Sequence, residues 1–126
     1  MSDNIALITI DSLRADHCGF MGYKKEVTPT MDKLSDEGIT FKNAFAPGPR
    51  TPESMPIVFT GEPLPTDLPD DLIEQREQIN KHMGSHSTIP ERLSKEGYKT
   101  IGVSPNPFAS RHFNFDNGFD QFYDFM

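Results

Sequence analysis

The sequence is poor in the residues that crosslink a chain or carry it through a membrane. Cys18 is the only cysteine among the 126 residues, so no disulfide can form within the chain. Tryptophan is absent, and the longest apolar run covers residues 5–10. A transmembrane helix needs about 20 successive apolar residues. The sequence therefore predicts neither an internal disulfide nor a membrane span.

Positive charge is scarce as well. The chain has 12 Lys and Arg against 19 Asp and Glu, which gives a formal net charge of -7 and a pI near 4.9. Proteins that bind the phosphate backbone of nucleic acids present a basic stripe. Here Lys24 and Lys25 form a pair on a predicted loop. We therefore expect no nucleic acid among the partners.

The N-terminus does not have the features of a signal peptide. Residues 1–4 carry no basic side chain, and the apolar stretch after them runs into Asp11 rather than into a small-residue cleavage site. We therefore predict a cytoplasmic protein. Hydrophobic residues make up 35% and charged residues 25%, as in soluble globular domains. The 126 residues suit one domain.

Three segments have the composition of strands. Residues 4–10 are almost all apolar, which is typical of a strand buried on both faces of a parallel sheet. Residues 39–45 alternate apolar and polar side chains, and residues 99–104 form a third short segment. Because helical segments lie between them, we predict an α/β fold with three parallel strands.

Proline and glycine mark the ends of two predicted helices. Thr28-Pro29 and Thr51-Pro52 each have the pattern of an N-cap followed by proline at the first helical position. Gly38 and Gly61 predict where these helices end. Pro56 lies in the middle of the second helix and predicts a kink or a short first segment there.

Two further helices are predicted in the second half of the chain. Residues 70–83 are polar and predict an exposed helix. Residues 88–91 have the sequence of a capping box, with proline in the first turn. The helix that begins there is predicted to end at Gly97.

The C-terminal tail is rich in aromatic residues. It contains Phe108, Phe113, Phe115, Phe119, Phe122 and Phe125. Aromatic rings bury large areas, and a three-stranded sheet offers little surface for them. The rings either form the edge of the core or pack on a surface outside this chain. For the second case we predict a chain-to-chain contact or an exposed apolar patch.

Two residues occupy positions suited to chemistry. Asp11 directly follows the predicted strand 4–10, and ligands of parallel sheets collect at the carboxyl ends of strands. Its carboxylate is either a metal ligand or a loop cap. Thr51 opens a predicted helix, where partial positive charge favours anions such as sulfate or phosphate. Its hydroxyl is either functional or an ordinary N-cap.

Taken together, these residues lie in stretches that resemble the sulfatase family of the alkaline-phosphatase-like superfamily. The resemblance is carried by NIALITIDSLRADHCGFMGY and TPTMDKLSDEGITFKNAFAPGPRTPESMPIVFTGE, and later by TIPERLSKEGYKTIGVSPNPF and NFDNGFDQFYDF. It implies an alkaline-phosphatase/sulfatase-like parallel-sheet fold. Residues 1–126 would be the N-terminal βαβ portion of one sulfatase-like domain.

The first family motif is Asp-Asp-Leu-Arg, whose acids bind a divalent cation. Residues 11–14 read Asp-Ser-Leu-Arg here, so the resemblance implies Asp11 as a ligand of Ca²⁺, Mg²⁺ or Mn²⁺. Ser12 replaces the second acid and offers a weaker hydroxyl oxygen. Such cations take about six oxygen ligands. We therefore predict weak or no metal binding by this chain alone.

The second family motif is Cys or Ser, any residue, Pro, any residue, Arg, with Thr-Gly some residues later. Counting back from Thr60 places Thr51 at the nucleophile, Glu53 at the proline and Met55 at the arginine. Oxidation of a threonine would give a ketone, so no formylglycine is expected. Phosphoglycerol and phosphoethanolamine transferases are similar in using an unmodified threonine. Arg50 is predicted either to contact the substrate in place of the missing arginine or to be an ordinary surface arginine.

These resemblances imply an arylsulfatase-like, metal-dependent hydrolase of small sulfate or phosphate esters. A threonine nucleophile favours phosphate esters over sulfate esters. A transferase of the kind just named and a non-catalytic relative are the alternatives, and a small regulatory or binding module is a third. The family's remaining ligands lie further along its sequence, so this chain alone is predicted to be inactive.

Overall fold

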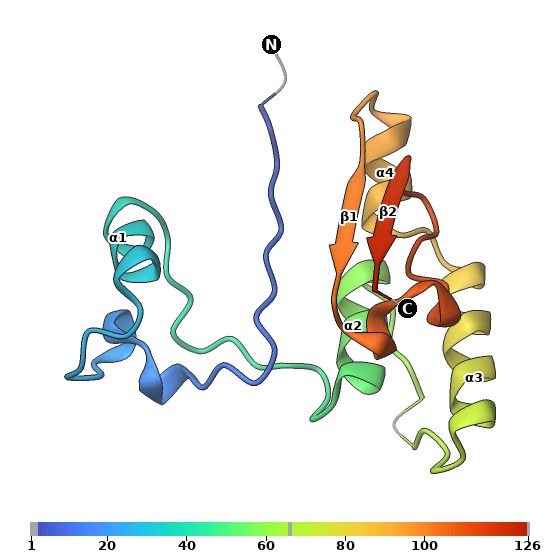
Figure 1. The fold of residues 1–126 in the computed structure, drawn as a ribbon, viewed down its shortest axis with the longest axis horizontal. Helices are drawn as coiled ribbons and strands as arrows, with labels where there is room; N and C mark the ends of the chain where they lie inside the picture. Colours follow the sequence, from blue (N-terminus) through green and yellow to red (C-terminus); the bar gives the residue numbers. More distant parts are fainter. Residues whose placement is uncertain (1–2, 66, 126) are drawn as a thin grey trace. The chain divides into compact units, whose positions relative to one another are not determined.

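The computed structural model describes residues 3–65 and 67–125 (Figure 1). The chain divides into two compact units, residues 1–44 and 45–126. Helices occur in both, and the second contains a parallel pair of strands. The α/β class predicted from the sequence is thus confirmed in its coarse form. The single domain inferred from chain length stays a prediction.

The described residues of the first unit form two short 3-10 turns and one helix. The turns are η1 (Ala15–His17) and η2 (Gly19–Met21), and the helix is α1 (Pro29–Glu37). The boundaries of α1 confirm the prediction. The Thr28 hydroxyl, however, does not cap the helix but accepts the Gly19 N–H at 2.8 Å. Asp32 accepts the Phe20 N–H at 2.8 Å, so the first turn of α1 holds η2 in place.

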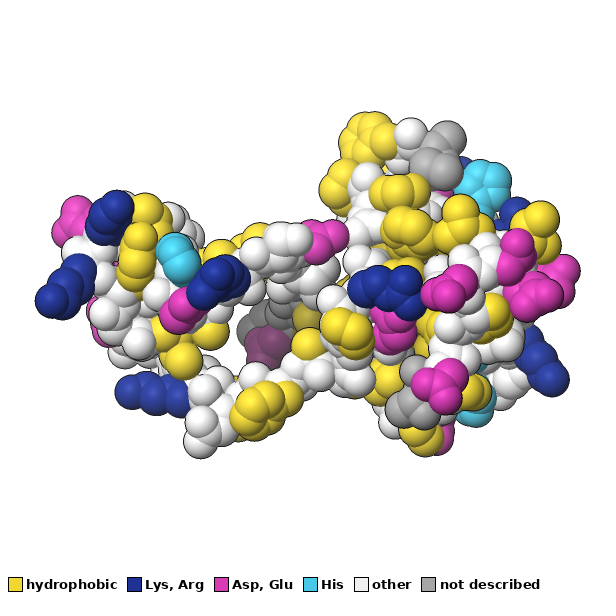
Figure 2. Space-filling model, turned by 90° about the horizontal axis from the view of Figure 1, so that it is seen from below, with side chains coloured by type: hydrophobic (Ala, Val, Ile, Leu, Met, Phe, Trp, Pro, Cys, Tyr) yellow, Lys and Arg dark blue, Asp and Glu magenta, His cyan; other side chains and the backbone are white. Residues whose placement is uncertain are grey.

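The segments predicted as strands at residues 4–10 and 39–45 take part in no sheet of the described residues, so the predicted three-stranded sheet does not form here. Their apolar side chains are exposed: Ile8 is 79% and Phe41 78% accessible. Figure 1 shows residues 3–10 as a stretched, unpaired trace, and Figure 2 shows hydrophobic side chains reaching the surface. A strand exists only when its N–H and C=O groups pair with a neighbour. Within the described ranges neither segment has such a neighbour.

The sheet of the second unit is made of β1 (Ile101–Ser104) and β2 (Gln121–Asp124). The strands run parallel and side by side, with Ile101 opposite Gln121 and Ser104 opposite Asp124 (Figure 1). β1 lies within the strand predicted at residues 99–104. β2 was not predicted, because its four residues belong to the aromatic tail. The 3-10 turns η3 (Pro107–Ala109) and η4 (Arg111–Phe113) connect the strands.

A reciprocal pair of hydrogen bonds fixes the register of β1 and β2. The Thr100 N–H donates to Asp120 Oδ2 at 2.8 Å, and the Asp120 N–H donates to Thr100 Oγ1 at 2.9 Å. Within the pair, Gly102 lies against the ring of Phe122, since an added Cβ would come within 2.9 Å of its Cε2. Larger residues at position 102 would therefore push the strands apart.

Three helices accompany these strands, namely α2 (Thr51–Thr60), α3 (Leu72–Ser85) and α4 (Ile89–Lys95). α2 ends at Gly61, as predicted, and continues through Pro56 without a break. α4 begins with the predicted capping box, in which Thr88 and Glu91 bond reciprocally. No helix of the described residues is both long enough and apolar enough to cross a bilayer.

The helix predicted as exposed, α3, in fact buries one face. Its buried residues are Gln75, Ile79, His82 and Met83, which recur at helical spacing. Of these, Ile79 and Met83 join a core cluster that otherwise consists of Leu64, Leu68, Ala109, Phe113 and Phe115. The sequence prediction was wrong here because polar residues outnumber the apolar ones along this helix.

The aromatic tail supplies much of this core. Phe113 and Phe115 are 8% and 1% accessible, and Phe115 meets Phe59 edge-to-face at 5.3 Å between ring centroids. Phe108 and Phe122 pack against the cluster in part, whereas Phe125 is 80% accessible. The tail is therefore mainly a core edge, and only its end is exposed. The chain-to-chain contact stays a prediction.

A buried histidine links α2 and α3. The Thr60 hydroxyl donates to the Pro56 carbonyl at 2.8 Å, so its one hydrogen is committed. His82 Nε2 lies 3.0 Å from the same oxygen and must donate to it. Nε2 of His82 therefore carries a proton, so the neutral ring is the Nε2–H tautomer. Burial, with a further contribution from His86, lowers the pKa of His82, and Glu62 opposes the shift.

Because of this shift, we expect the second unit to lose stability as the pH falls below about 6.5, the usual pKa of histidine. A group whose pKa is lower in the folded state binds its proton more readily in the unfolded state, so acid favours unfolding. Thermal unfolding between pH 8 and pH 5 measures the effect. His82→Gln should reduce the fall in melting temperature between pH 8 and pH 5, whereas replacing the exposed His112 by Gln should not. Equal slopes for all three proteins would contradict the expectation.

Candidate active site

The predicted metal ligands Asp11 and Ser12 lie in a tight turn of the first unit. Ser12 has a left-handed backbone, with φ of 58°, which is uncommon for a residue other than glycine. Its hydroxyl donates to Asp11 Oδ1 at 3.0 Å. A hydroxyl that donates in this way keeps its lone pairs for a cation. The backbone strain and this bond together hold the two oxygen donors adjacent.

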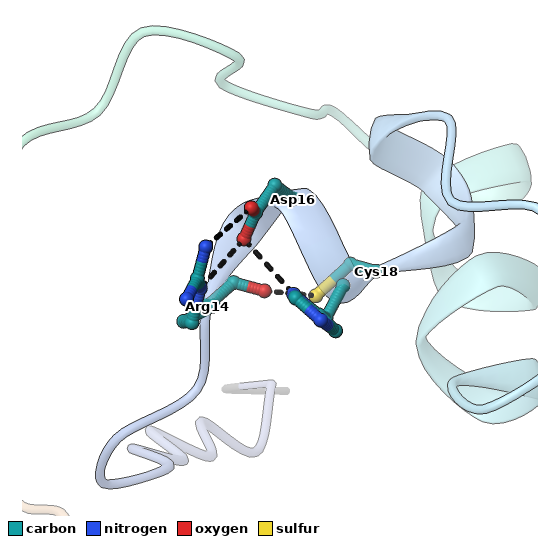
Figure 3. A network of polar contacts seen from close by, with 4 residues as sticks. Arg14, Asp16 and Cys18 are labelled. Atoms are coloured by element: carbon teal, nitrogen blue, oxygen red, sulfur yellow. Dashed lines mark hydrogen bonds and ion pairs between the residues drawn. The ribbon is translucent and has the colours of Figure 1, made fainter.

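The loop after this turn is organised around Arg14 (Figure 3). Its guanidinium binds both carboxylate oxygens of Asp16, at 2.9 and 2.7 Å, and its carbonyl accepts the Cys18 thiol at 3.4 Å. The hydrogen bond from Arg14, followed by that from His17, lowers the pKa of Asp16. Arg14 therefore uses its charge within the loop, in agreement with a structural role.

Asp11 and Ser12 provide the type of ligand atom that a hard divalent cation prefers, but too few ligands to fill its coordination shell. Asp11 and Ser12 provide oxygen, which Ca²⁺, Mg²⁺ and Mn²⁺ prefer. No group of three or more His, Cys, Asp or Glu that could hold a metal ion occurs in the part of the chain that the structure describes. A complete coordination shell would need ligands besides these two residues.

Thr51 is the first residue of α2 rather than its N-cap, which corrects the position predicted from the sequence. Arg50 occupies the N-cap and makes no side-chain cap. The Thr51 hydroxyl is therefore not used to satisfy the first turn of the helix, and the residue is half-buried. This removes the main structural explanation for a threonine at this position.

Asn106 brings a polar group to this hydroxyl from the carboxyl end of β1. Asn106 Nδ2 donates to Thr51 Oγ1 at 3.2 Å. The residue is two positions beyond the last residue of β1, where ligands of parallel sheets collect. Sequence reasoning applied this rule to Asp11 but missed Asn106. The signal was present, because Asn106 is a polar residue two positions after the end of the predicted strand 99–104.

Arg50, the predicted substrate contact, forms an ion pair with Glu53. Arg50 Nε donates to Glu53 Oε1 at 2.6 Å, and this bond raises the pKa of Arg50. The Glu53 side chain is only 13% accessible, and its other carboxylate oxygen has no hydrogen-bond partner among the described residues. Part of the Arg50 charge is thus balanced within α2. Its role toward a substrate stays a prediction.

The structure brings Thr51, Arg50 and Asn106 together at the N-terminal end of α2. Asp11 and Ser12 belong to the first unit and Thr51 to the second. The predicted convergence of Asp11 and Thr51 on one cation therefore stays a prediction.

A family model and the curated relatives that match the chain all point to sulfatases. A model of the family described as Sulfatase matches residues 3–126. Iduronate 2-sulfatase of Mus musculus is 33% identical over 100 residues, which cover 79% of this chain and 17% of that protein. Arylsulfatase of Clostridium perfringens is 36% identical over 100 residues, which cover 79% of this chain and 20% of that protein.

The chain spans about a fifth of the length of the curated relatives that it matches. No solved structure matches it significantly.

Proposed function

Since the chain belongs to the sulfatase family, we propose that the protein containing it is an ester hydrolase whose nucleophile is the unmodified hydroxyl of Thr51. Its substrates are small phosphate or sulfate esters, with phosphate esters favoured. The proposal concerns the whole protein, because residues 1–126 correspond to only 17–20% of the matched relatives.

The placement of the Thr51 hydroxyl supports this proposal most directly. Thr51 is the first residue of α2, and the partial positive charge at this end of the helix favours an anionic substrate. It makes no cap, and an amide from the end of β1 lies 3.2 Å from its oxygen. A threonine that only terminated the helix would instead bond to the N–H groups of the first turn.

The proposed reaction has two displacements. Thr51 Oγ attacks phosphorus and forms the Oγ–P bond, and its hydroxyl proton passes to water. The bond from phosphorus to the alcohol oxygen breaks, and that oxygen keeps the electron pair and takes up a proton. Water then attacks the phosphorus of the threonine ester and loses a proton, the Oγ–P bond breaks, and phosphate is released while Oγ takes up a proton to restore the hydroxyl. Such a covalent intermediate divides one difficult step into two easier ones.

Asp11 and Ser12 are proposed to bind a divalent cation together with ligands from elsewhere in the protein. Bound there, such a cation would act as a Lewis acid and neutralise negative charge. Formylglycine is not part of this proposal, because a threonine cannot form its aldehyde. The cytoplasmic location predicted from residues 1–4 also stays a prediction.

The family membership favours the alkaline-phosphatase-like fold predicted from the sequence. We propose that residues 4–10 and 39–45 are strands of the larger parallel sheet in the whole protein. The apolar side chains that these segments expose, among them Ile8 and Phe41, would then be buried.

A substrate panel tests the proposed activity. The whole protein, stripped of metal with EDTA, is assayed with Mg²⁺, Ca²⁺ or Mn²⁺ on 4-nitrophenyl phosphate, bis(4-nitrophenyl) phosphate and 4-nitrophenyl sulfate. We expect a metal-dependent turnover that is faster for a phosphate ester than for the sulfate ester.

The other outcomes distinguish the alternatives. Turnover of the sulfate ester alone would contradict a preference for phosphorus. Phosphoryl transfer to added glycerol at the expense of hydrolysis would identify a transferase. Failure on all three substrates would favour a non-catalytic relative, for which Ser12, Glu53 and Met55 at motif positions are the supporting observations.

A further inference from the structure

We infer that Asn106 is a positioning residue for the Thr51 nucleophile, donating a hydrogen bond to its oxygen and so favouring the ionised form. The inference rests on the proposed function of Thr51. Asn106 lies in the third stretch that carries the family resemblance, but the two motifs that give the metal ligand and the nucleophile do not include it. Its Nδ2 lies 3.2 Å from Thr51 Oγ1, and the surroundings of the amide determine its orientation.

The surroundings determine which end of the amide faces Thr51. The Phe108 N–H donates to Asn106 Oδ1 at 2.9 Å. A backbone N–H can bind only the oxygen of a side-chain amide, so the oxygen is on that side. The nitrogen must then face Thr51. Asn106 is therefore a donor to the hydroxyl and not an acceptor.

The loop that carries Asn106 is rigid. Pro105 and Pro107 flank the residue and fix two backbone angles. Ser104 Oγ accepts the Asn106 N–H at 3.3 Å, and η3, which Asn106 caps, packs against α2. The amide therefore has little freedom to leave the hydroxyl, and both residues are half-buried.

This arrangement has two effects on the hydroxyl. Because Thr51 Oγ accepts from Asn106, its own hydrogen must point in another direction, where a base or water can remove it. A donated hydrogen bond also stabilises the oxygen more strongly once it is negatively charged. The bond thus aligns the nucleophile and lowers the cost of ionising it.

Asn106→Ala in the whole protein tests the inference, with the most active ester of the panel as substrate. We expect kcat to fall about 10- to 100-fold, as for the loss of one hydrogen bond to a charged group, while KM changes less than twofold. The ascending limb of the pH profile of kcat/KM should move to higher pH. A merely structural residue would change the melting temperature without moving this limb.

Asn106→Asp is the matched variant. The carboxylate keeps an acceptor for the Phe108 N–H, so the start of η3 is preserved, but it places an oxygen opposite Thr51. We expect a loss of kcat at least as large as that of the alanine variant, with a nearly unchanged melting temperature. Normal turnover in Asn106→Asp would overturn the inference, because donation would then be unnecessary.

A double-mutant cycle with Thr51→Ala separates this inference from the proposed function. If Asn106 acts through Thr51, adding Asn106→Ala to Thr51→Ala should reduce the residual activity no further. If Thr51→Ala is inactive but Asn106→Ala is normal, the inference fails and the proposed function stands. If Thr51→Ala is fully active, the proposed function itself fails.

Discussion

Thr51→Ala should remove nearly all ester turnover from the whole protein, by a factor on the order of 10³ or more, as for the loss of other nucleophiles that form covalent intermediates. Its hydroxyl is the group proposed to bond to phosphorus, and no other described hydroxyl has its combination of helix start and amide donor. Initial rates on the best panel substrate, with equal metal content, measure the effect.

The same substitution should cost little stability. It removes one side-chain hydrogen bond, which contributes about 1 kcal/mol, and alanine favours the helix more than threonine does. Thr51→Ser retains a hydroxyl and should keep much of the activity. Thr30→Ala, in the first turn of α1, is a control that should change neither rate nor stability appreciably. Full activity in Thr51→Ala would rule out the nucleophile.

Gly118→Ala should destabilise the second unit by about 2–4 kcal/mol, from a left-handed backbone and a steric clash. Gly118 has φ of 89°. A Cβ there would lie 2.6 Å from the Glu91 backbone nitrogen and 2.9 Å from Thr88 Oγ1. These atoms form the capping box of α4, and the Thr88 hydroxyl donates to the Asn117 carbonyl at 3.0 Å. The clash therefore meets backbone that cannot easily move.

Gly97→Ala provides the matched control. Its φ of 86° is almost the same, but an added Cβ would meet no atom within 4 Å. This variant should lose only the backbone contribution of about 1–2 kcal/mol. Denaturant unfolding of the three proteins gives the difference. An equal loss in both variants would show that the clash at Gly118 is relieved by small movements.

The parts of the fold that the sequence predicted well depend on neighbouring residues. The capping box of α4 joins Thr88 to Glu91, three positions away, and Gly61 ends α2 through a bond to Ile57. Such contacts are contained within one turn of chain, so a local pattern is enough to recognise them.

The parts of the fold and of the site that were not predicted correctly depend on contacts between residues far apart in the sequence. Residues 4–10 have the composition of a strand, but a strand also needs a neighbour, which no local pattern supplies. β2 escaped prediction because its pairing with β1 crosses 20 positions, from Ile101 to Gln121. In the candidate site, Thr51 was predicted from motif spacing. Asn106 was missed because its contact with Thr51 spans 55 residues.

The separation of 55 positions between Thr51 and Asn106 affects the order in which the site forms during synthesis. On the ribosome, α2 emerges well before the segment that contains Asn106, because synthesis proceeds from the N-terminus. Until those later residues have been made and β1 has folded, the Thr51 hydroxyl lacks its hydrogen bond from Asn106. Under the proposed function, a nascent chain therefore carries the nucleophile without this donor, and full reactivity requires that the core of the second unit has folded.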